Sequence, residues 1–189
     1  MQLVMKQLPN PAEGISPTDI ERLCERAKTG DEAAFEALYR VTVGKIYGLC
    51  LRMTADPSLA EDCTQNTYIR AWQKLAEFRG ESGITTWLHR IAVNEVLGAH
   101  RREKRHRHEQ VDVPTLIGEG LSVDIDLERA ISALPERARQ VFVLFGIYGY
   151  GHKETASLLE IAEGTSKAHY HQARRLLQGT LGGKDESGE

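Results

Sequence analysis

Hydrophobic residues recur at three- and four-residue intervals along most of the chain, the spacing that lines one face of an α-helix. After Asp31, which suits a helix start, one continuous stripe runs through Phe35, Leu38, Thr42, Ile46, Leu49 and Met53. Asp56-Pro57 breaks this helix. A second helix is predicted to begin at Ser58. The residues that line one face of it are Cys63, Thr67, Ala71, Leu75 and Phe78.

Two further helices are predicted in the N-terminal half. One begins near Thr18 and ends at Thr29-Gly30, where glycine suits a helix C-terminus. The other is capped by Thr85 or Thr86 and buries Trp87, Leu88, Ile91, Ala92 and Val96. Four helices with short connections predict one compact bundle over residues 18–108.

The remaining segments predict a second helical unit. Residues 109–123 contain Pro114, Gly118 and Gly120, little periodicity and mostly acidic charge, and so read as a flexible linker. Residues 124–178 contain an apolar stripe from Leu127 to Leu134, Pro135 in the first turn of a new helix ending near Gly146 or Gly149, and helices over 153–159 and 165–178. Residues 1–17 and 179–189 are expected to be a flexible arm and tail. No β alternation is sustained, so the predicted fold is all-α.

The most informative segment is a helix, a tight turn over Ile161–Gly164 and a second helix, which is the pattern of a helix-turn-helix. Its predicted inner face consists of Ala156, Leu159, Ile161, Ser166, Tyr170, Ala173 and Leu177. The opposite face of the second helix presents Lys167, Ala168, His169, His171, Gln172, Arg174 and Arg175. In a major groove such a helix would place Lys167, His169 and Gln172 near bases and Arg174 and Arg175 at phosphates. The alternative is the solvated face of an ordinary bundle.

The amino-acid composition limits the classes of protein to which this chain could belong. The chain has 189 residues, of which 41% are hydrophobic and 27% charged, as expected for a globular protein. It has no apolar run of membrane-spanning length, and its N-terminus lacks the apolar core of a secretory signal, so we expect a cytoplasmic protein without membrane insertion. Three cysteines without a CxxC pair suggest neither a disulfide framework nor a zinc ribbon, and Cys50 and Cys63 are expected to be small buried side chains.

Charge is unevenly distributed although the total is only −3. Residues 87–108 contain six Arg or Lys against two Glu, and residues 109–126 contain five acids and no Arg or Lys. Arg90 and Asn94 could contact phosphate and adenine, and the loop over 78–86 could hold an extruded base. The alternative for the basic run is a solvated helix end. The outer face of the helix over 58–78, with Glu61, Asp62, Gln65, Arg70 and Lys74, is either plain surface or a protein-docking face.

Three motifs together resemble the extracytoplasmic-function sigma factors of bacterial RNA polymerase. The segment Ala60–Trp72 is similar to their polymerase-binding helix, Thr86–Asn94 to their minus-ten helix, and Glu163–Arg174 to their minus-thirty-five recognition helix. The order of the motifs and the acidic linker also match, over about residues 20–178.

The resemblance implies sigma region 2 over 18–108, sigma region 4 over 124–178, and a factor that directs promoter recognition and DNA melting without catalysis. Its implied partners are the β and β′ subunits of core polymerase, promoter DNA and an anti-sigma factor. For core polymerase the implied residues are Glu61, Asp62, Gln65 and Arg70, with Trp72 expected to pack. For the minus-ten element they are Arg79, Ser82, Arg90, Asn94, Arg101 and Arg102. For the minus-thirty-five element they are Thr165, Lys167, His169, His171, Gln172, Arg174 and Arg175.

This sequence departs from the family pattern at four positions. Asn66 replaces an acidic residue, which bears on one polymerase contact, and Glu160 replaces a frequent glycine before the turn. His169 and Gln172 replace frequent arginines, which predicts an unusual minus-thirty-five preference.

Three other classes compete with this interpretation. A metalloenzyme would need ligands, but in His106-x-His108 and His169-x-His171 the paired side chains point apart on a helix, so no metal, cofactor or catalytic group is expected. A transcriptional regulator would bind DNA tightly alone as a dimer. A structural interaction bundle would have no salt-dependent DNA affinity.

Overall fold

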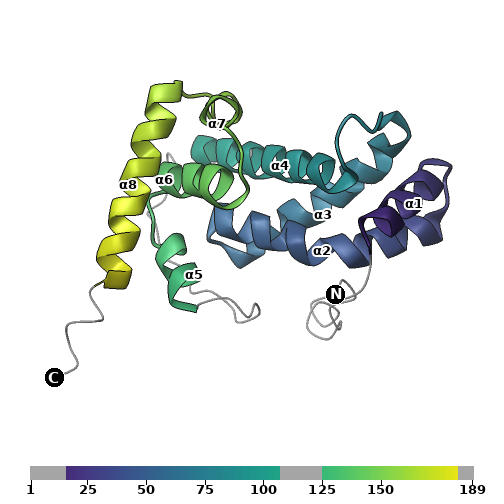
Figure 1. The fold of residues 1–189 in the computed structure, drawn as a ribbon, viewed down its shortest axis with the longest axis horizontal. Helices are drawn as coiled ribbons and strands as arrows, with labels where there is room; N and C mark the ends of the chain where they lie inside the picture. The colour runs from purple at the N-terminus through teal and green to yellow at the C-terminus, as the bar shows by residue number, and fades with distance from the viewer. Residues whose placement is uncertain (1–15, 107–124, 183–189) are drawn as a thin grey trace.

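The first half of the chain is a bundle of four long helices. A computed structural model describes residues 16–106 and 125–182 (Figure 1). The bundle comprises α1 (Pro17–Lys28), α2 (Glu32–Thr54), α3 (Pro57–Lys74), the short 3-10 helix η1 (Leu75–Glu77) and α4 (Ile84–His106). The predicted linker 109–123, the arm over 1–15 and the tail from 183 onward lie outside the described residues.

The second half is built from shorter helices around the long C-terminal one (Figure 1). These are α5 (Ile125–Ser132), α6 (Glu136–Val141), the π-helical segment η3 (Phe142–Ile147), α7 (His152–Leu159) and α8 (Glu163–Gly182). The residues that the structure describes contain helices and no strand, which confirms the predicted all-α fold. None of these helices is long and apolar enough to cross a membrane.

Helix starts follow the polar residues that precede them. The side chain of Asp31 accepts a hydrogen bond from the Ala34 amide at 3.0 Å, which confirms its predicted capping role. Asp56 caps α3 in the same way, with Pro57 as its first residue, so that helix begins one residue before the predicted Ser58.

Two predicted helix ends are wrong. The cap at Thr85 or Thr86 is wrong, because α4 already begins at Ile84, whose side chain is buried in the core. The predicted tail from 179 is wrong for its first residues, because α8 continues to Gly182 and Leu181 packs against the core.

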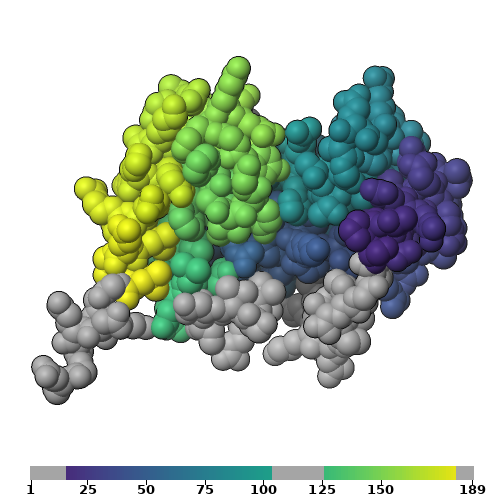
Figure 2. All heavy atoms as spheres, viewed as in Figure 1, coloured from purple at the N-terminus to yellow at the C-terminus, as the bar shows by residue number. Residues whose placement is uncertain are grey.

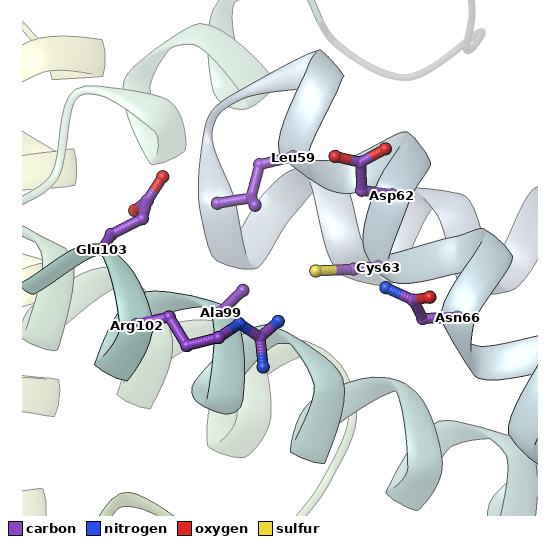
Figure 3. Close-up of a pocket in the computed structure, with 7 residues that line it drawn as sticks. All are labelled: Leu59, Asp62, Cys63, Asn66, Ala99, Arg102 and Glu103. Atoms are coloured by element: carbon purple, nitrogen blue, oxygen red, sulfur yellow. The ribbon is translucent and has the colours of Figure 1, made fainter. Parts of the chain in front are cut away.

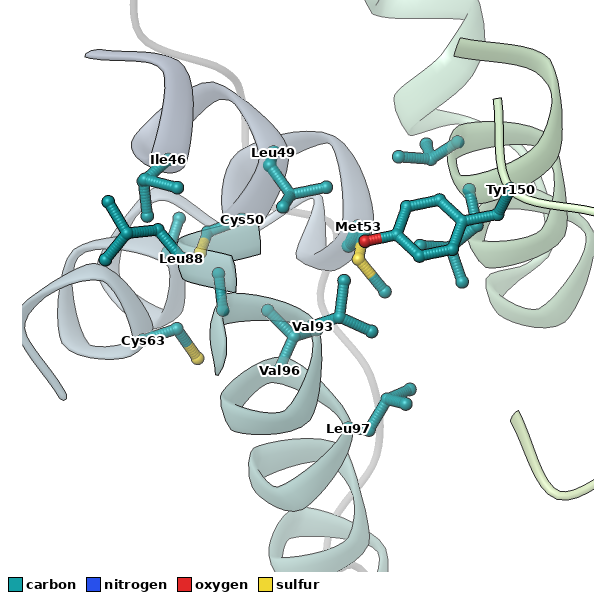
Figure 4. Packing of buried hydrophobic residues seen from close by; sticks show 14 of the residues in the cluster. Ile46, Leu49, Cys50, Met53, Cys63, Leu88, Val93, Val96, Leu97 and Tyr150 are labelled. Atoms are coloured by element: carbon teal, nitrogen blue, oxygen red, sulfur yellow. The ribbon is translucent and has the colours of Figure 1, made fainter. Parts of the chain in front are cut away.

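The core of the bundle lies where α2, α3 and α4 meet. Fully buried side chains there include Ile46, Leu49, Met53, Leu88 and Val93 (Figure 4). Each comes from a predicted apolar stripe or its direct neighbour, as expected for helices that bury one face. Cys50 and Cys63 are buried free thiols, which confirms the sequence interpretation. Burial raises the pKa of Cys50 to about 12, so this thiol stays protonated and inert.

The two halves of the chain pack directly against each other. One hydrophobic cluster runs from Cys24 in α1 to Leu177 in α8 without a break. Tyr150, just before α7, points at Met53 near the end of α2 (Figure 4). The space-filling view shows the C-terminal helices in contact with the N-terminal bundle (Figure 2). The two predicted units therefore share one core in this arrangement.

Candidate nucleic-acid interface

The helix-turn-helix of α7 and α8 is fixed by contacts between its inner faces. Ala156, Leu159, Ser166, Ala173 and Leu177 are buried, as the sequence predicted. The same place holds a polar link that the apolar pattern did not predict. Nδ1 of His152, the first residue of α7, lies 3.0 Å from Oγ of Ser166 on α8.

The ring of His152 also stacks on Phe145, with 3.8 Å between ring centroids. Tyr170 of α8 meets the Phe145 ring edge-on at 4.7 Å. The aromatic residues that precede α7 therefore brace both helices and hold the outer face of α8 in a fixed orientation. The spacing of these residues along the chain gave no signal of this contact.

The turn differs from the prediction. It consists of Glu160–Ala162, and Gly164 lies inside α8 rather than in the turn. The left-handed backbone conformation falls on Glu160, with φ of 55°. This is the position where the resemblance led us to expect glycine, and a side chain here costs about 1 kcal/mol or more relative to glycine.

The outer face of α8 carries the seven residues predicted to meet the minus-thirty-five element. Thr165, Lys167, His171, Arg174 and Arg175 are exposed, and His169 and Gln172 are half-buried. His169 Nδ1 lies 3.4 Å from Gln172 Oε1, so these two predicted base-contacting residues form one unit. Arg174 lies over the Tyr170 ring.

Lys167 is held by an acid on its own helix. Its Nζ lies 2.7 Å from Glu163 Oε1, and the hydrogen bond from Lys167 lowers the pKa of Glu163. A carboxylate in the first turn of a helix also suits the positive end of the helix dipole. DNA phosphate would have to compete with Glu163 for this lysine.

Three predicted minus-ten residues lie along one face of α4. Arg90, Asn94 and Arg101 are exposed, and their spacing of four and seven residues aligns them along the helix. Arg90 Nη2 lies 3.4 Å from Glu154 Oε1, and Arg101 Nη1 lies 2.7 Å from Glu160 Oε1. Both acids belong to the α7 end of the helix-turn-helix.

Arg102 points elsewhere. It lines a groove of about 410 Å³ between α3 and α4, together with Leu59, Asp62, Cys63, Asn66, Ala99 and Glu103. Its guanidinium is directed toward α3 (Figure 3). The structure therefore separates Arg102 from Arg101, because successive residues of a helix point about 100° apart.

The loop between η1 and α4 carries the other two predicted minus-ten residues. Arg79 is exposed and Ser82 is half-buried. At the base of this loop the rings of Phe78 and Trp87 lie 5.2 Å apart, centroid to centroid. This aromatic pair joins the two ends of the loop.

The exposed face of α3 contains the predicted polymerase-binding residues Glu61, Asp62 and Gln65. Two apolar residues that the prediction left out share this face: Ile69 is 49% exposed and Trp72 is 39% exposed. The expectation that Trp72 packs holds for one side of its ring only, which contacts Phe35 at 4.8 Å between centroids. Large apolar side chains on a polar helix face are typical of a protein-docking site.

Arg70 is set apart from that face. Its Nε lies 2.6 Å from Oε1 of Glu95, whose side chain is buried. Arg70 thus balances a buried carboxylate between α3 and α4. Among residues 16–106 and 125–182 no group of three or more His, Cys, Asp or Glu is placed to hold a metal ion.

Comparisons with known proteins identify the family. Residues 38–106 match the model of sigma-70 region 2, and residues 124–177 match that of sigma-70 region 4. The chain is 32% identical over 156 residues to the ECF RNA polymerase sigma factor SigM of Mycobacterium tuberculosis, a match that spans 81% of this chain and 80% of that protein. It is 29% identical to SigW of Bacillus subtilis, over 86% of this chain and 96% of the relative.

A solved structure shows the same fold. The sigma factor RpoE of Bartonella quintana, crystallised with the anti-sigma factor NepR, superposes with a TM-score of 0.62 at 24% identity, over 78% of this chain and 96% of that one. Together with the helix-turn-helix and the exposed helix faces, these matches show that the chain belongs to the extracytoplasmic-function sigma factors of bacterial RNA polymerase.

Proposed function

We propose that this sigma factor binds core polymerase through the exposed face of α3 and reads two promoter elements with separate helices. Residues of α4 and the preceding loop contact the minus-ten element, and the outer face of α8 contacts the minus-thirty-five element. In this proposal residues 18–108 act as region 2 and residues 124–178 as region 4. The protein acts in the cytoplasm by binding alone, without a cofactor or a catalytic group of its own.

The observation that carries the proposal is the division of α8 into two faces. Its inner face is buried against α7 and the aromatic residues before it, while its outer face exposes Lys167, Arg174 and Arg175. A recognition helix needs this arrangement, because its base-contacting side chains must be oriented by a rigid support. Core polymerase supplies the catalysis. The contacts with the two promoter elements reinforce each other because one chain joins the two DNA-binding helices.

The docking face on α3 supports the polymerase part of the proposal. Ile69 and Trp72 supply apolar area, and Glu61, Asp62 and Gln65 add polar groups on the preceding turns of the same helix face. An apolar centre with a polar rim is the usual anatomy of a protein interface. We assign this face to the β or β′ subunit of core polymerase. The relative crystallised with an anti-sigma factor supports a regulatory partner of that class.

Run-off transcription with purified core polymerase on a promoter library tests the function, and Trp72→Ala tests the docking face. We expect Trp72→Ala to weaken binding to core at least tenfold, because truncating an interface tryptophan removes a large apolar contact. Gln178→Ala, at an exposed position of α8 outside this face, is the control and should leave binding unchanged. Equal binding by both variants would rule out this face.

Arg175→Ala tests the DNA-reading face of α8. Losing one phosphate contact should reduce the slope of log affinity against log salt by about 0.9. Arg22→Ala on α1, also exposed, removes the same charge away from the proposed interface. If both variants lower the slope equally, α8 is not the DNA-binding face.

A further inference from the structure

A buried carboxylate lies between the helix proposed to bind polymerase and the helix proposed to meet the minus-ten element. Glu95 of α4 is 4% exposed. Its Oε1 lies 2.6 Å from Nε of Arg70 on α3, and the Arg70 side chain is 55% exposed. One partner of this ion pair therefore belongs to the core, whereas the other is in contact with solvent.

The pair continues a line of contact between the two helices, which we call the α3–α4 seam. The groove between these helices is lined by Leu59, Cys63 and Asn66 of α3 and by Ala99 and Arg102 of α4 (Figure 3). Arg70 follows Asn66 by four residues, and Glu95 precedes Ala99 by four. Each therefore lies on the groove-lining face of its helix, about one turn beyond the groove.

The surroundings of Glu95 offer its charge little compensation. Burial, and after it the negative charge of Glu95, raises the pKa of the Cys63 thiol to about 11, so the carboxylate lies close to a group that does not ionise. Ala92 and Ala99, one turn before and after Glu95, are buried apolar residues. In the part of the chain that the structure describes, Arg70 is the one cation paired with Glu95.

Removing that cation would leave a charge in the core. A buried carboxylate without a partner is far less favourable than the loss of an exposed ion pair. Because the backbone fixes Glu95 to α4, bringing its carboxylate to water requires α4 to turn or slide against α3. The exposed guanidinium of Arg70 makes this movement unnecessary.

Such a movement would displace the DNA-facing row of α4. Asn94 is adjacent to Glu95, and Arg90 and Arg101 lie on the same rigid helix. All three move with it, while α3 stays fixed by its proposed contact with polymerase. Recognition geometry tolerates displacements of only about 0.5 Å or 10–20°. The charge balance in the seam therefore bears directly on base and phosphate contacts.

We propose that Arg70 is a positioning residue of promoter recognition: it balances Glu95 and so keeps α4 oriented for the minus-ten element. It acts through Glu95 and makes no contact with polymerase. Arg70 lies about 100° around α3 from Ile69 and about 140° from Gln65, which separates it from the docking face. The inference rests on the proposed minus-ten role of α4.

Arg70→Met tests this role when it is made in two backgrounds, the parent chain and Glu95→Met. In the parent the substitution leaves the Glu95 carboxylate unbalanced. In Glu95→Met no carboxylate is present, and the double variant replaces the ion pair by two apolar side chains, a change that buried pairs often tolerate. Arg70→Lys keeps the charge. Arg40→Met on α2 is the matched control, because Arg40 is equally exposed and its partner Glu36 lies on the surface.

Two measurements with core polymerase separate docking from promoter opening. Fluorescence anisotropy of the labelled sigma factor gives its affinity for core. The fluorescence of 2-aminopurine in the minus-ten element, on a promoter taken from the run-off library, gives the rate of open-complex formation. Circular dichroism at the assay temperature checks that each variant is folded.

We expect Arg70→Met to slow opening at least tenfold in the parent chain, which corresponds to the loss of about one bidentate base contact. Its affinity for core should stay within twofold of the parent value. In the Glu95→Met background the same substitution should change the opening rate by less than about twofold. Arg70→Lys should stay within about threefold of the parent, and Arg40→Met should match it.

Four results would overturn the inference. Weaker core binding in both backgrounds would make Arg70 a polymerase contact, and equally slowed opening in both would make it a DNA contact. Unchanged opening by Arg70→Met, or an equal loss in Arg40→Met, would show that the balance of Glu95 has no role. If Arg70→Met does not fold in the parent chain, the Glu95→Met background decides, because loss of Arg70 must be harmless there.

Run-off transcription by the parent chain distinguishes this failure from a failure of the proposed function. If the parent holoenzyme makes transcripts while any overturning result is obtained, the sigma function stands and the positioning role of Arg70 is wrong. If the parent chain directs no transcription, the proposed function itself is wrong.

Discussion

Replacing Arg139 with methionine would show how much one buried side chain contributes to this fold. Arg139 is 8% exposed, and its guanidinium donates four hydrogen bonds to main-chain carbonyls and none to a carboxylate among the described residues. The carbonyl of Met53 needs this donor, because the residue four positions on is Pro57, which has no N–H. The amide of Ser58 is equally unavailable to Thr54, since it donates to Asp56.

The expected cost follows from these acceptors. A buried carbonyl left without a donor costs about 1–3 kcal/mol, and methionine fills the space of the stem without donating. Part of the cost is recovered, because the guanidinium no longer has to be desolvated; burial already lowers the pKa of Arg139. We therefore expect Arg139→Met to reduce the free energy of unfolding by about 2–4 kcal/mol, because the two carbonyls at the end of α2 lose their donor.

Urea unfolding followed by far-ultraviolet circular dichroism measures this loss. Arg129→Met is the matched control, because Arg129 is exposed on the neighbouring helix α5. We expect the control to change stability by less than about 0.5 kcal/mol. A loss below about 1 kcal/mol for Arg139→Met, or equal losses for both variants, would refute the reasoning.

Two further predictions concern the pH dependence of stability and the strain at residues with left-handed backbone conformation. Burial, and to a smaller extent Lys45, lowers the pKa of His89 from 6.5, so the unfolded chain takes up a proton more readily than the folded one. Stability should therefore be full above about pH 6.5 and fall as the pH drops below it, and urea midpoints at pH 7 and about 5.5 should differ less in His89→Gln. Ala55→Gly should stabilise by roughly 0.5–1 kcal/mol, because Ala55 has φ of 56°. Glu160→Gly should gain less in the same assay, since it also loses an ion pair; equal gains would show that this pair contributes nothing.

Much of the fold was predictable from local pattern. The apolar stripe from Phe35 to Met53 is one helix, and Asp31 caps it. The errors fall at helix ends, where tertiary contacts outweigh local sequence. Ile84 is buried in the core, and α4 therefore begins two or three residues before the start that the capping pattern predicts.

The candidate site was predictable in part. Spacing correctly divided α8 into an inner and an outer face, because a single helix has one period. It could not show that Glu154 and Glu160 meet α4, or that Arg102 turns toward α3, since these contacts join segments far apart in sequence. Ile69 and Trp72 were also missed, because an apolar residue on a helix gives the same signal whether it is buried or exposed.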